Sequence, residues 1–505
     1  MKKISLLVIG LMSMTNFYGQ DLNDALRYSS DNITGTARFA AMSGAFGALG
    51  GDLTAIGINP AGSAVFTKSY ASISLSYLTV RNEVGYFNNQ STDDASKFDI
   101  HQIGAAFVFA NGNIESPWRK LVLSVAYDKT NDFKNRWGAA GANTNSIYQY
   151  FLGYAQGQRL DEISAFPEET IGEAYNDIGQ SYGYGNQQAF LGYESFILDP
   201  EVDSDENTAY ISNVGDGSFN QNYSYRSIGY NGKFSVNVAS QFGDNLFVGL
   251  NLNSHFINFE KSTYLFESNN NVGSFVTEID FQNNLRTTGN GFSLQIGGIY
   301  KLTNELRAGL SYSSPTWFRI FEETTQYVST LVNDETGDFR QIVDPGTVNI
   351  FPEYRLRSPS SYKASLAYVF GEQGLISFDY GRKDYGNIEF RPTDDPAFRA
   401  QNDNISNSLK SAATYNFGAE YRVKTWSFRG GYRFEESPYE NEDFYGNLSG
   451  YSLGLGYNFG NFKLDVAYTD HNRDYNQRLY ESGLTDTARL KSDNKNVILS
   501  LGFSL

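Results

Sequence analysis

The chain has 505 residues and a formal net charge of −17, and it contains 49 Gly, 36 Tyr, 38 Phe, 11 Pro and no Cys. The lack of cysteine excludes disulfides, thiol catalysis, Cys-based zinc sites and a lipoprotein anchor, and the acidic balance argues against a nucleic-acid partner. A soluble chain of this length would divide into several domains. No linker-like boundary follows Ser69, so one large unit is the simpler prediction.

Residues 1–19 have the pattern of a secretory signal peptide. Lys2 and Lys3 form a charged start, residues 4–14 are apolar, and cleavage is predicted before Gln20. The apolar run is too short to cross a membrane as a helix. The mature chain is therefore expected to be exported from the cytoplasm.

Residues 20–68 predict a compact plug. The stretch 21–30 has the spacing of a short amphipathic helix. The stretch 42–66 is nearly all Gly, Ala and small apolar residues, too broken by glycine for a long helix and too poor in β-branched residues for a strand. Within it, residues 59–62 (Asn-Pro-Ala-Gly) predict a tight turn that opens a helical turn, because Pro fixes φ and Asn bonds its own backbone.

From Ser69 onward the sequence alternates with period two, which predicts about 14 strands. The expected strands are 69–81, 98–110, 120–131, 226–242, 245–266, 285–302, 305–328, 354–371, 374–390, 410–423, 425–436, 447–459, 461–476 and 494–505. An even number of strands is the rule for single-chain bacterial barrels. The predicted fold is all-β: a transmembrane antiparallel β-barrel over residues 69–505, with the plug in its lumen.

The connections between these strands alternate in length. Short turns are expected near residues 243, 303, 372, 424 and 460, whereas the long connections are 82–97, 132–225, 267–284, 329–353, 391–409, 437–446 and 477–493. Short periplasmic turns and long outer loops are typical of outer-membrane barrels. This parity places the plug and the C-terminus at the periplasmic end.

The connection 132–225 is too long for plain coil and is rich in Tyr and Phe. Residues 147–155 and 160–178 have helical spacing, broken at Pro167. We therefore predict a partly helical extracellular cap. Two interpretations stay open: a cap that offers an apolar first binding site, and a cap whose aromatic side chains only pack against one another.

The sequence gives little sign of catalysis or metal binding. His101 shares a face with outward apolar residues, His255 is predicted to face the lumen, and the third histidine, His471, has no metal-ligand spacing with either. The glycines near Gly44 follow no strand, which excludes a dinucleotide fingerprint. We expect no catalytic residue, no cofactor and no metal site. Charged residues predicted to face the lumen are Lys233, Asp379, Lys383 and Lys463.

A glycine-rich run, an Asn-Pro-Ala turn and a long alternating chain, in this order, resemble the bacterial long-chain fatty-acid transporter family (FadL/TodX-type outer-membrane transport proteins), with a Bacteroidetes-like member as the nearest type. The residues that carry the resemblance are 41–46, 50–52 and 59–62. In that family the run forms an N-terminal hatch. The resemblance thus implies these hatch and substrate-path residues: Gly44, Phe46, Gly50, Gly51, Asn59, Pro60, Ala61 and Gly62.

The resemblance also implies a function: passive uptake of hydrophobic compounds such as long-chain fatty acids or aromatic hydrocarbons across the outer membrane. The ligand would pass from the outer loops to an apolar pocket between wall and hatch, and then sideways into the membrane. Its partners would be hydrophobic small molecules and outer-membrane lipid or lipopolysaccharide. The alternative is an accessory or structural subunit of an outer-membrane secretion or protein-assembly complex, with other outer-membrane proteins as partners.

Overall fold

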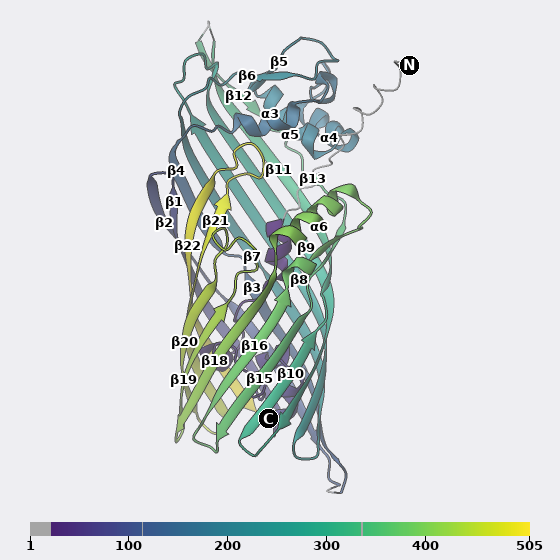
Figure 1. Ribbon diagram of the computed structural model, residues 1–505, viewed down its shortest axis with the longest axis vertical. Helices are drawn as coiled ribbons and strands as arrows, with labels where there is room; N and C mark the ends of the chain where they lie inside the picture. The colour runs from purple at the N-terminus through teal and green to yellow at the C-terminus, as the bar shows by residue number, and fades with distance from the viewer. Residues whose placement is uncertain (1–21, 114, 335–336) are drawn as a thin grey trace.

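The computed structural model describes residues 22–113, 115–334 and 337–505. The expected export signal lies outside this part of the chain. Tilted strands form a tall barrel, the N-terminal segment lies inside it, and helices gather at one end (Figure 1). The barrel predicted from the period-two pattern is confirmed: fourteen antiparallel strands form it, and the first pairs with the last.

Most of the barrel strands are continuous. They are β1 (Tyr70–Tyr86), β2 (Asn89–Ala110), β3 (Trp118–Asp132), β7 (Phe219–Phe242), β8 (Leu246–Ser268), β9 (Val276–Lys301), β18 (Ser411–Val423), β19 (Trp426–Glu435), β20 (Leu448–Asn458), β21 (Phe462–Arg478) and β22 (Thr487–Ser504). Three barrel strands are interrupted and consist of β10 (Leu306–Ser313) with β11 (Trp317–Asp334), β14 (Tyr354–Arg357) with β15 (Ser361–Phe370), and β16 (Gly374–Asp384) with β17 (Glu389–Arg391).

The outer face of the wall is apolar and the inner face is polar, which is the reverse of the arrangement in a soluble protein. On β8, Leu250 and Leu252 are exposed on the outside, whereas Asn251 and Asn253 are buried on the lumen side. An apolar outer face and a polar inner face are the signature of a barrel that stands in lipid. In the described part of the chain, no helix has both the length and the apolar character needed to span a membrane.

Several predicted long connections are wrong because the strands extend further than expected. Strands β1 and β2 continue to a two-residue turn at Phe87-Asn88, so the expected loop 82–97 is a hairpin. The expected loops 267–284 and 477–493 likewise shorten to residues 269–275 and 479–486. Beyond the lipid the outer face of these strands is mostly polar, while inner residues such as Tyr86 and Phe281 pack against the cap, so the outward apolar alternation that marks a membrane strand is absent there.

The long connection between β3 and β7 forms a cap with helices (Figure 1). It contains β4 (Asn135–Asn143), α3 (Tyr148–Ala155), η3 (Leu160–Glu162), α4 (Ile171–Ser181), α5 (Tyr184–Glu194), β5 (Leu198–Pro200) and β6 (Tyr210–Ser212). The predicted helical cap is confirmed in outline. Helix α4 begins four residues after Pro167, where Thr170 and Glu173 form a capping box. Helix α5, by contrast, had no clear signal, since its residues are buried on most sides.

Four further elements lie in the connections at the same end of the barrel as the cap. They are β12 (Gly337–Val343), β13 (Asn349–Ile350), η4 (Tyr385–Asn387) and α6 (Pro396–Ser408). The sequence predicted only a loop over 391–409, although Asp395 and Pro396 carry a helix-start signal: the Asp395 carboxylate accepts from the backbone N–H of Ala397 at 2.9 Å. Phe398 and Ile405 of α6 are buried among side chains of the barrel mouth.

The N-terminal segment (residues 22–66) fills the barrel interior. It comprises α1 (Leu22–Ser29), α2 (Ala37–Ala41), η1 (Thr54–Gly57) and η2 (Pro60–Val65). The helix predicted over 21–30 is confirmed, and its Leu22 and Leu26 join the buried cluster of α6. The predicted helical turn after Asn59 is also confirmed, because η2 begins at Pro60 with Asn59 as its cap.

Candidate functional site

The wall strands carry glycine where the N-terminal segment approaches their backbone. A Cβ added at Gly297 of β9 would overlap Asn59, and one at Gly249 of β8 would overlap Pro60. Only glycine allows such close contact between two backbones. Two further wall glycines face the segment in the same way: Gly309 and Gly431. The fit is therefore built into the wall as well as into the glycine-rich run.

Asn59 joins the N-terminal segment to the wall. Its Nδ2 donates to the carbonyl oxygen of Gly47 at 2.7 Å and to that of Gly298 on β9 at 3.0 Å. Its Oδ1 accepts from the backbone N–H of Ala61 at 3.1 Å and so caps η2. One buried side chain thus fixes the turn, the preceding loop and a wall strand.

The other residues that the resemblance singled out surround this turn. Gly44, Gly50 and Gly51 have φ values of 74°, 61° and 68°, which strain any other residue. Phe46 is fully buried, and the guanidinium of Arg38 lies 5.1 Å from the centre of its ring. The remaining ones, Pro60, Ala61 and Gly62, are buried in η2. The structure brings all eight residues together in the lumen, and their role in a substrate path stays a prediction.

Asp379 of β16 holds the glycine-rich run from the wall. Its Oδ2 accepts from the backbone N–H groups of Phe46 at 3.0 Å and Gly47 at 2.9 Å. The prediction that Asp379 faces the lumen is confirmed. The carboxylate binds backbone there instead of only meeting water, and a charge-assisted bond of this kind is strong in a buried place.

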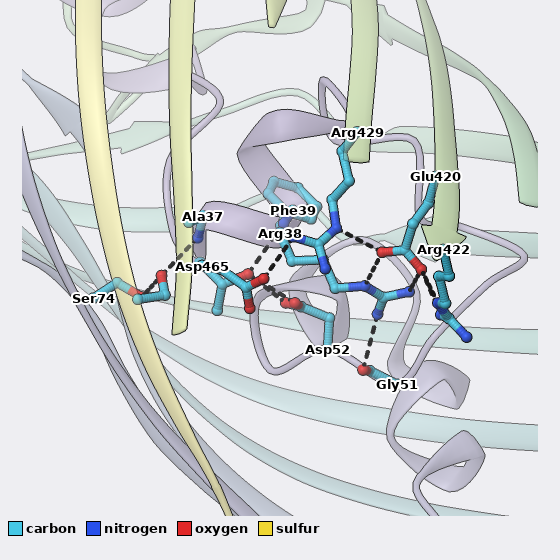
Figure 2. Close-up of polar contacts among 12 residues, drawn as sticks. Ala37, Arg38, Phe39, Gly51, Asp52, Ser74, Glu420, Arg422, Arg429 and Asp465 are labelled. Carbon is cyan, nitrogen blue, oxygen red and sulfur yellow. Dashed lines mark hydrogen bonds and ion pairs between the residues drawn. The ribbon is translucent and has the colours of Figure 1, made fainter. Parts of the chain in front are cut away.

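A buried ion network ties α2 to the wall (Figure 2). Arg38 donates through Nε to Glu420 of β18 at 2.9 Å, and Arg429 of β19 donates to the same carboxylate at 2.6 Å. Arg429 also reaches Asp465 of β21 at 2.6 Å, and Arg422 completes the shell of Glu420. The sequence does not reveal this network, because its members are scattered over the chain.

The same network continues inside the N-terminal segment. Asp52 accepts from the hydroxyl of Thr36 at 2.8 Å, and the Thr36 hydroxyl in turn caps α2. Burial raises the pKa of Asp52, and the nearby Arg38 offsets this only in part. Burial lowers the pKa of Arg38, but Glu420 reverses the shift and holds the guanidinium charged. Both residues therefore depend on their partners.

A cavity of about 200 Å³ lies between the N-terminal segment and the wall. The expected apolar pocket is wrong at this place, because most lining side chains are polar. Lys383 donates to Asp31 at 3.0 Å and to the carbonyl oxygen of Ser29 at 2.9 Å. The acidic, basic and histidine residues that line the cavity are Asp31, Asp128, Lys233, His255, Lys363, Asp379, Arg382, Lys383, Arg433 and Glu435.

The position of Asp31 in this cavity shifts its pKa. Enclosure in the barrel raises the pKa, but the ammonium groups of Lys383 and Lys233 lower it more, so the net pKa lies below the ordinary range. The carboxylate is open to the cavity and is therefore ionised at neutral pH. The lumen-facing predictions for Lys233, His255 and Lys383 are confirmed, and Lys463 shares the inner face of β21 with the buried Asp465, although it does not line the cavity.

The backbone ladder of the wall is incomplete between β2 and β3. Its pairs run from Ala110–Lys120 to Gln102–Asp128 and end there, although β2 continues to Asn89. Beyond this point β4 pairs only with β7, and side chains such as Ser91 bond its carbonyl oxygens. Asp128 lies at the cavity, so the ladder ends beside the lumen space.

A β-bulge marks the same height on β2. The pairing of β2 with β1 passes from Gln102 directly to Ile100, which leaves His101 without a partner. His101 was predicted to face the lipid, and this is wrong: the extra residue turns both His101 and Gln102 inward, where they are buried. The alternation of the sequence alone did not reveal the bulge.

Side chains span the interval between β2 and β3 above the ladder. The ammonium of Lys129 lies 2.5 Å from Asp99 and 2.7 Å from Asp132. Lys97 adds a second cation 3.0 Å from Asp99. The wall is thus held here by ion pairs in place of a backbone ladder.

The aromatic residues of the cap pack against one another and against the wall. Tyr150 and Phe151 of α3 lie with their ring centres 5.6 and 5.0 Å from Phe281 of β9. Tyr480 stacks on Phe281 at 5.7 Å and lies 5.4 Å from Tyr150. Of the two interpretations of the cap, these contacts favour the self-packed one. In the described residues, no group of three or more acidic or histidine side chains is arranged to hold a metal ion.

Among solved structures, the fold is similar to the toluene transporter TodX of P. putida, with a TM-score of 0.53 and 12% identity over 94% of this chain and 99% of that chain. It is also similar to a FadL homologue of Pseudomonas aeruginosa, with a TM-score of 0.52 and 11% identity over 94% and 100%. These identities support the fold alone. A comparison with curated protein sequences finds no match.

The sequence itself matches a protein family. Residues 207–505 fit the family model described as outer membrane protein transport protein (OMPP1/FadL/TodX). The matched residues include all of β7 to β22, which is more than half of the chain, and not the N-terminal segment that carried the resemblance. The chain therefore belongs to this family of outer-membrane transport proteins.

Proposed function

We propose that the protein is a passive outer-membrane channel for hydrophobic compounds, with the N-terminal segment as its movable hatch. The observation that carries the proposal is the end of the β2–β3 ladder at Gln102 and Asp128, beside the lumen cavity. Backbone ladders close a barrel wall against lipid, so an interval held by side chains is a place where a ligand can leave sideways into lipid. Outer-membrane lipid would receive the ligand there.

The cavity chemistry favours one class of ligand within the family's range. Lys233 and Lys363 line the cavity, and Lys383 shares it with Asp31. A carboxylate placed among these ammonium groups gains charge-assisted hydrogen bonds, whereas an aromatic hydrocarbon gains none. We therefore place long-chain fatty acids ahead of aromatic hydrocarbons as substrates, with the acid group bound in the cavity and the chain directed toward the wall.

The hatch would move by a small displacement rather than by unfolding. Asn59, Asp379 and Glu420 tie the N-terminal segment to three different parts of the wall. Transfer of the apolar chain from water to lipid is downhill and supplies the driving force, so energy coupling is not required. A ligand acid that competes for Lys383 would loosen the contact to Asp31 and Ser29 at the edge of the cavity.

The test exploits the absence of cysteine from the chain. Asp99→Cys with Lys129→Cys places two thiols across the interval, and a flexible bis-maleimide then joins β2 to β3. The control pair is Thr79→Cys with Ser96→Cys, whose hydroxyls lie 3.2 Å apart on the paired strands β1 and β2. Uptake of a radiolabelled long-chain fatty acid is measured in cells that lack the natural gene. We expect cross-linking to reduce uptake at least about tenfold only for the first pair.

The possible outcomes separate the parts of the proposal. If cells with the gene and cells without it take up fatty acids equally, and likewise aromatic hydrocarbons, the transport function is contradicted. Uptake that depends on the gene but not on the cross-link contradicts the sideways exit. Uptake that is independent of the gene, together with co-purification of a secretion or assembly component from detergent, supports the accessory role instead.

A further inference from the structure

Three arginines stand side by side on the outer face of the barrel. Arg319 of β11 pairs directly with Arg355 of β14, and Arg355 pairs directly with Arg391 of β17. All three residues are exposed, on the face opposite to the buried Phe318, Leu356 and Phe390. Like charges directly across neighbouring strands destabilise a sheet. Such a row is therefore expected to have an anionic partner.

Carboxylates of the chain neutralise the row only in part. Arg319 lies 3.9 Å from Glu353, and Glu389 serves both Arg391 at 2.9 Å and Arg357 at 3.4 Å. Within the described part of the chain, the guanidinium of Arg355 makes no hydrogen bond or ion pair. Arg355 lies at the centre of the row, so its five N–H donors are available to a ligand.

The arginines surround a hollow of about 300 Å³ in the wall. Its lining consists of Trp317, Phe318, Arg319, Arg355, Leu356, Arg357 and Arg391. The hollow lies where the wall is interrupted, since β10 gives way to β11 and β14 to β15 at residues 314–316 and 358–360. The planar fork of arginine matches both carboxylates and phosphates, and a phosphate can bind several arginines at once because it offers three strong acceptor oxygens.

The height of the arginine row on the barrel indicates that the phosphate belongs to a lipid headgroup. Trp317 lies eleven residues beyond Leu306 at the turn end, which at about 3.3 Å per residue and a tilt of about 40° corresponds to about 28 Å. An outer-membrane barrel has an apolar band about 25 Å tall. The exposed rings of Trp317 and Phe292, which are paired across β11 and β9, mark its upper rim, as interfacial aromatic residues do. Arg319 therefore lies directly above the band.

Charged groups typical of a solvent-exposed surface lie farther along the wall, four residues beyond Arg319 on β11. Arg286 of β9 lies between Glu260 and Glu323 on the outer face, at 4.0 and 3.9 Å. Here carboxylates outnumber the guanidinium two to one, and all three groups are exposed, as expected outside the membrane. The unbalanced arginine row thus occupies the level of the lipid headgroups and not that of the solvent.

We propose that this arginine row binds the phosphate groups of an outer-leaflet lipid, with lipid A of lipopolysaccharide as the expected form. The phosphates would lie in the hollow against Arg319, Arg355 and Arg391, and the acyl chains would follow the apolar wall below Trp317. The inference depends on the family and its outer-membrane location, and not on the transported compound. The transport proposal names outer-membrane lipid as a partner without saying which residues bind it, and this inference assigns those residues.

The test is native mass spectrometry of the full mature chain in detergent, titrated with lipid A that carries both phosphates. The variant combines Arg319→Gln, Arg355→Gln and Arg391→Gln, which removes the charge and leaves a shorter polar side chain at each position. Arg286→Gln is the matched control, because this exposed arginine lies on the same outer face, opposite Glu323 of β11 and outside the arginine row. We expect one tightly bound lipid A on the wild type and the control, and an affinity at least about tenfold lower for the triple variant.

Two further ligands distinguish the source of the phosphate. Lipid A without its phosphates should bind no better to the wild type than to the triple variant, and inorganic pyrophosphate should compete only weakly with lipid A. Equal binding of lipid A to wild type and triple variant overturns the proposal, and so does pyrophosphate binding as tight as that of lipid A. Heat-modifiable mobility on gels verifies that each variant is folded. Fatty-acid uptake by the triple variant is measured separately, so failure of the lipid site and failure of transport are distinguishable.

Discussion

Arg38 of the N-terminal segment and Glu420 of β18 form an ion pair of 2.9 Å although 382 residues separate them in the chain. Glu420 is buried and is also bound by Arg429 and Arg422. A buried carboxylate with several guanidinium partners leaves uncompensated charge when it is removed. The pair therefore ties the N-terminal segment to the wall.

The first prediction concerns this pair. Glu420→Gln keeps the shape of the side chain but leaves Arg38 and Arg429 without their anion, so the free energy of unfolding should fall by about 3 to 5 kcal/mol. Urea unfolding in detergent, followed by tryptophan fluorescence, measures the change. Glu372→Gln, in an exposed turn, is the control and should have no effect. Equal stability of both variants would show that the network does not stabilise the fold.

The second prediction separates two neighbouring glycines of β9. Gly297→Ala forces a methyl group into Asn59, whereas Gly298→Ala meets only the carbonyl oxygen of Phe247 at 3.7 Å, an ordinary contact. Overpacking of this kind costs about 1 to 3 kcal/mol. Gly297→Ala should therefore displace the N-terminal segment and expose Arg38 to trypsin, and Gly298→Ala should not. Similar protection in both variants would contradict the close fit at Asn59.

The third prediction separates the two roles of Asn59. Asn59→Asp keeps an oxygen that can cap Ala61 but replaces the Nδ2 donor to Gly47 and Gly298 with a second acceptor. Asn59→Ala removes both roles, at a cost of about 1 to 2 kcal/mol for the cap alone. We expect Asn59→Asp to be at least as destabilising as Asn59→Ala in the same urea experiment. Wild-type stability of Asn59→Asp would mean that only the cap matters.

The fourth prediction concerns pH. The pKa of Asp31 is lower in the folded chain than in the unfolded chain, because Lys383 and Lys233 outweigh the effect of enclosure. The ionised carboxylate therefore adds stability at neutral pH, and this contribution is lost as the pH falls from about 4 through the lower folded pKa. Asp31→Asn should lower the melting temperature at pH 7 and make it less sensitive to acid between pH 5 and 3.

The difference between wild type and Asp31→Asn isolates this group from the other carboxylates, which titrate in both proteins. A melting temperature that falls by the same amount in both proteins from pH 5 to pH 3 would exclude Asp31 as the source. Lys383→Met offers an independent comparison, since it removes the main cause of the pKa shift. It should reduce the acid sensitivity in the same direction as Asp31→Asn.

Local pattern was sufficient for much of the architecture. The period-two alternation of residues such as Leu250 and Leu252 predicted the barrel and which face of each strand meets lipid. The Asn59-Pro60 pair predicted the start of η2, because both the fixed φ and the cap are local properties. The alternation failed in polar strand ends such as residues 89–97, where both faces meet water.

The site itself required contacts between distant parts of the chain. Sequence alone determined that a glycine-dense N-terminal stretch precedes a wall of alternating strands, since both features are periodic or compositional. Only the tertiary structure decided that Glu420 meets Arg38, that a bulge turns His101 inward, and that three arginines align across the interrupted strands. Register and ion pairing depend on how distant strands meet, and a shift of one residue reverses every side chain.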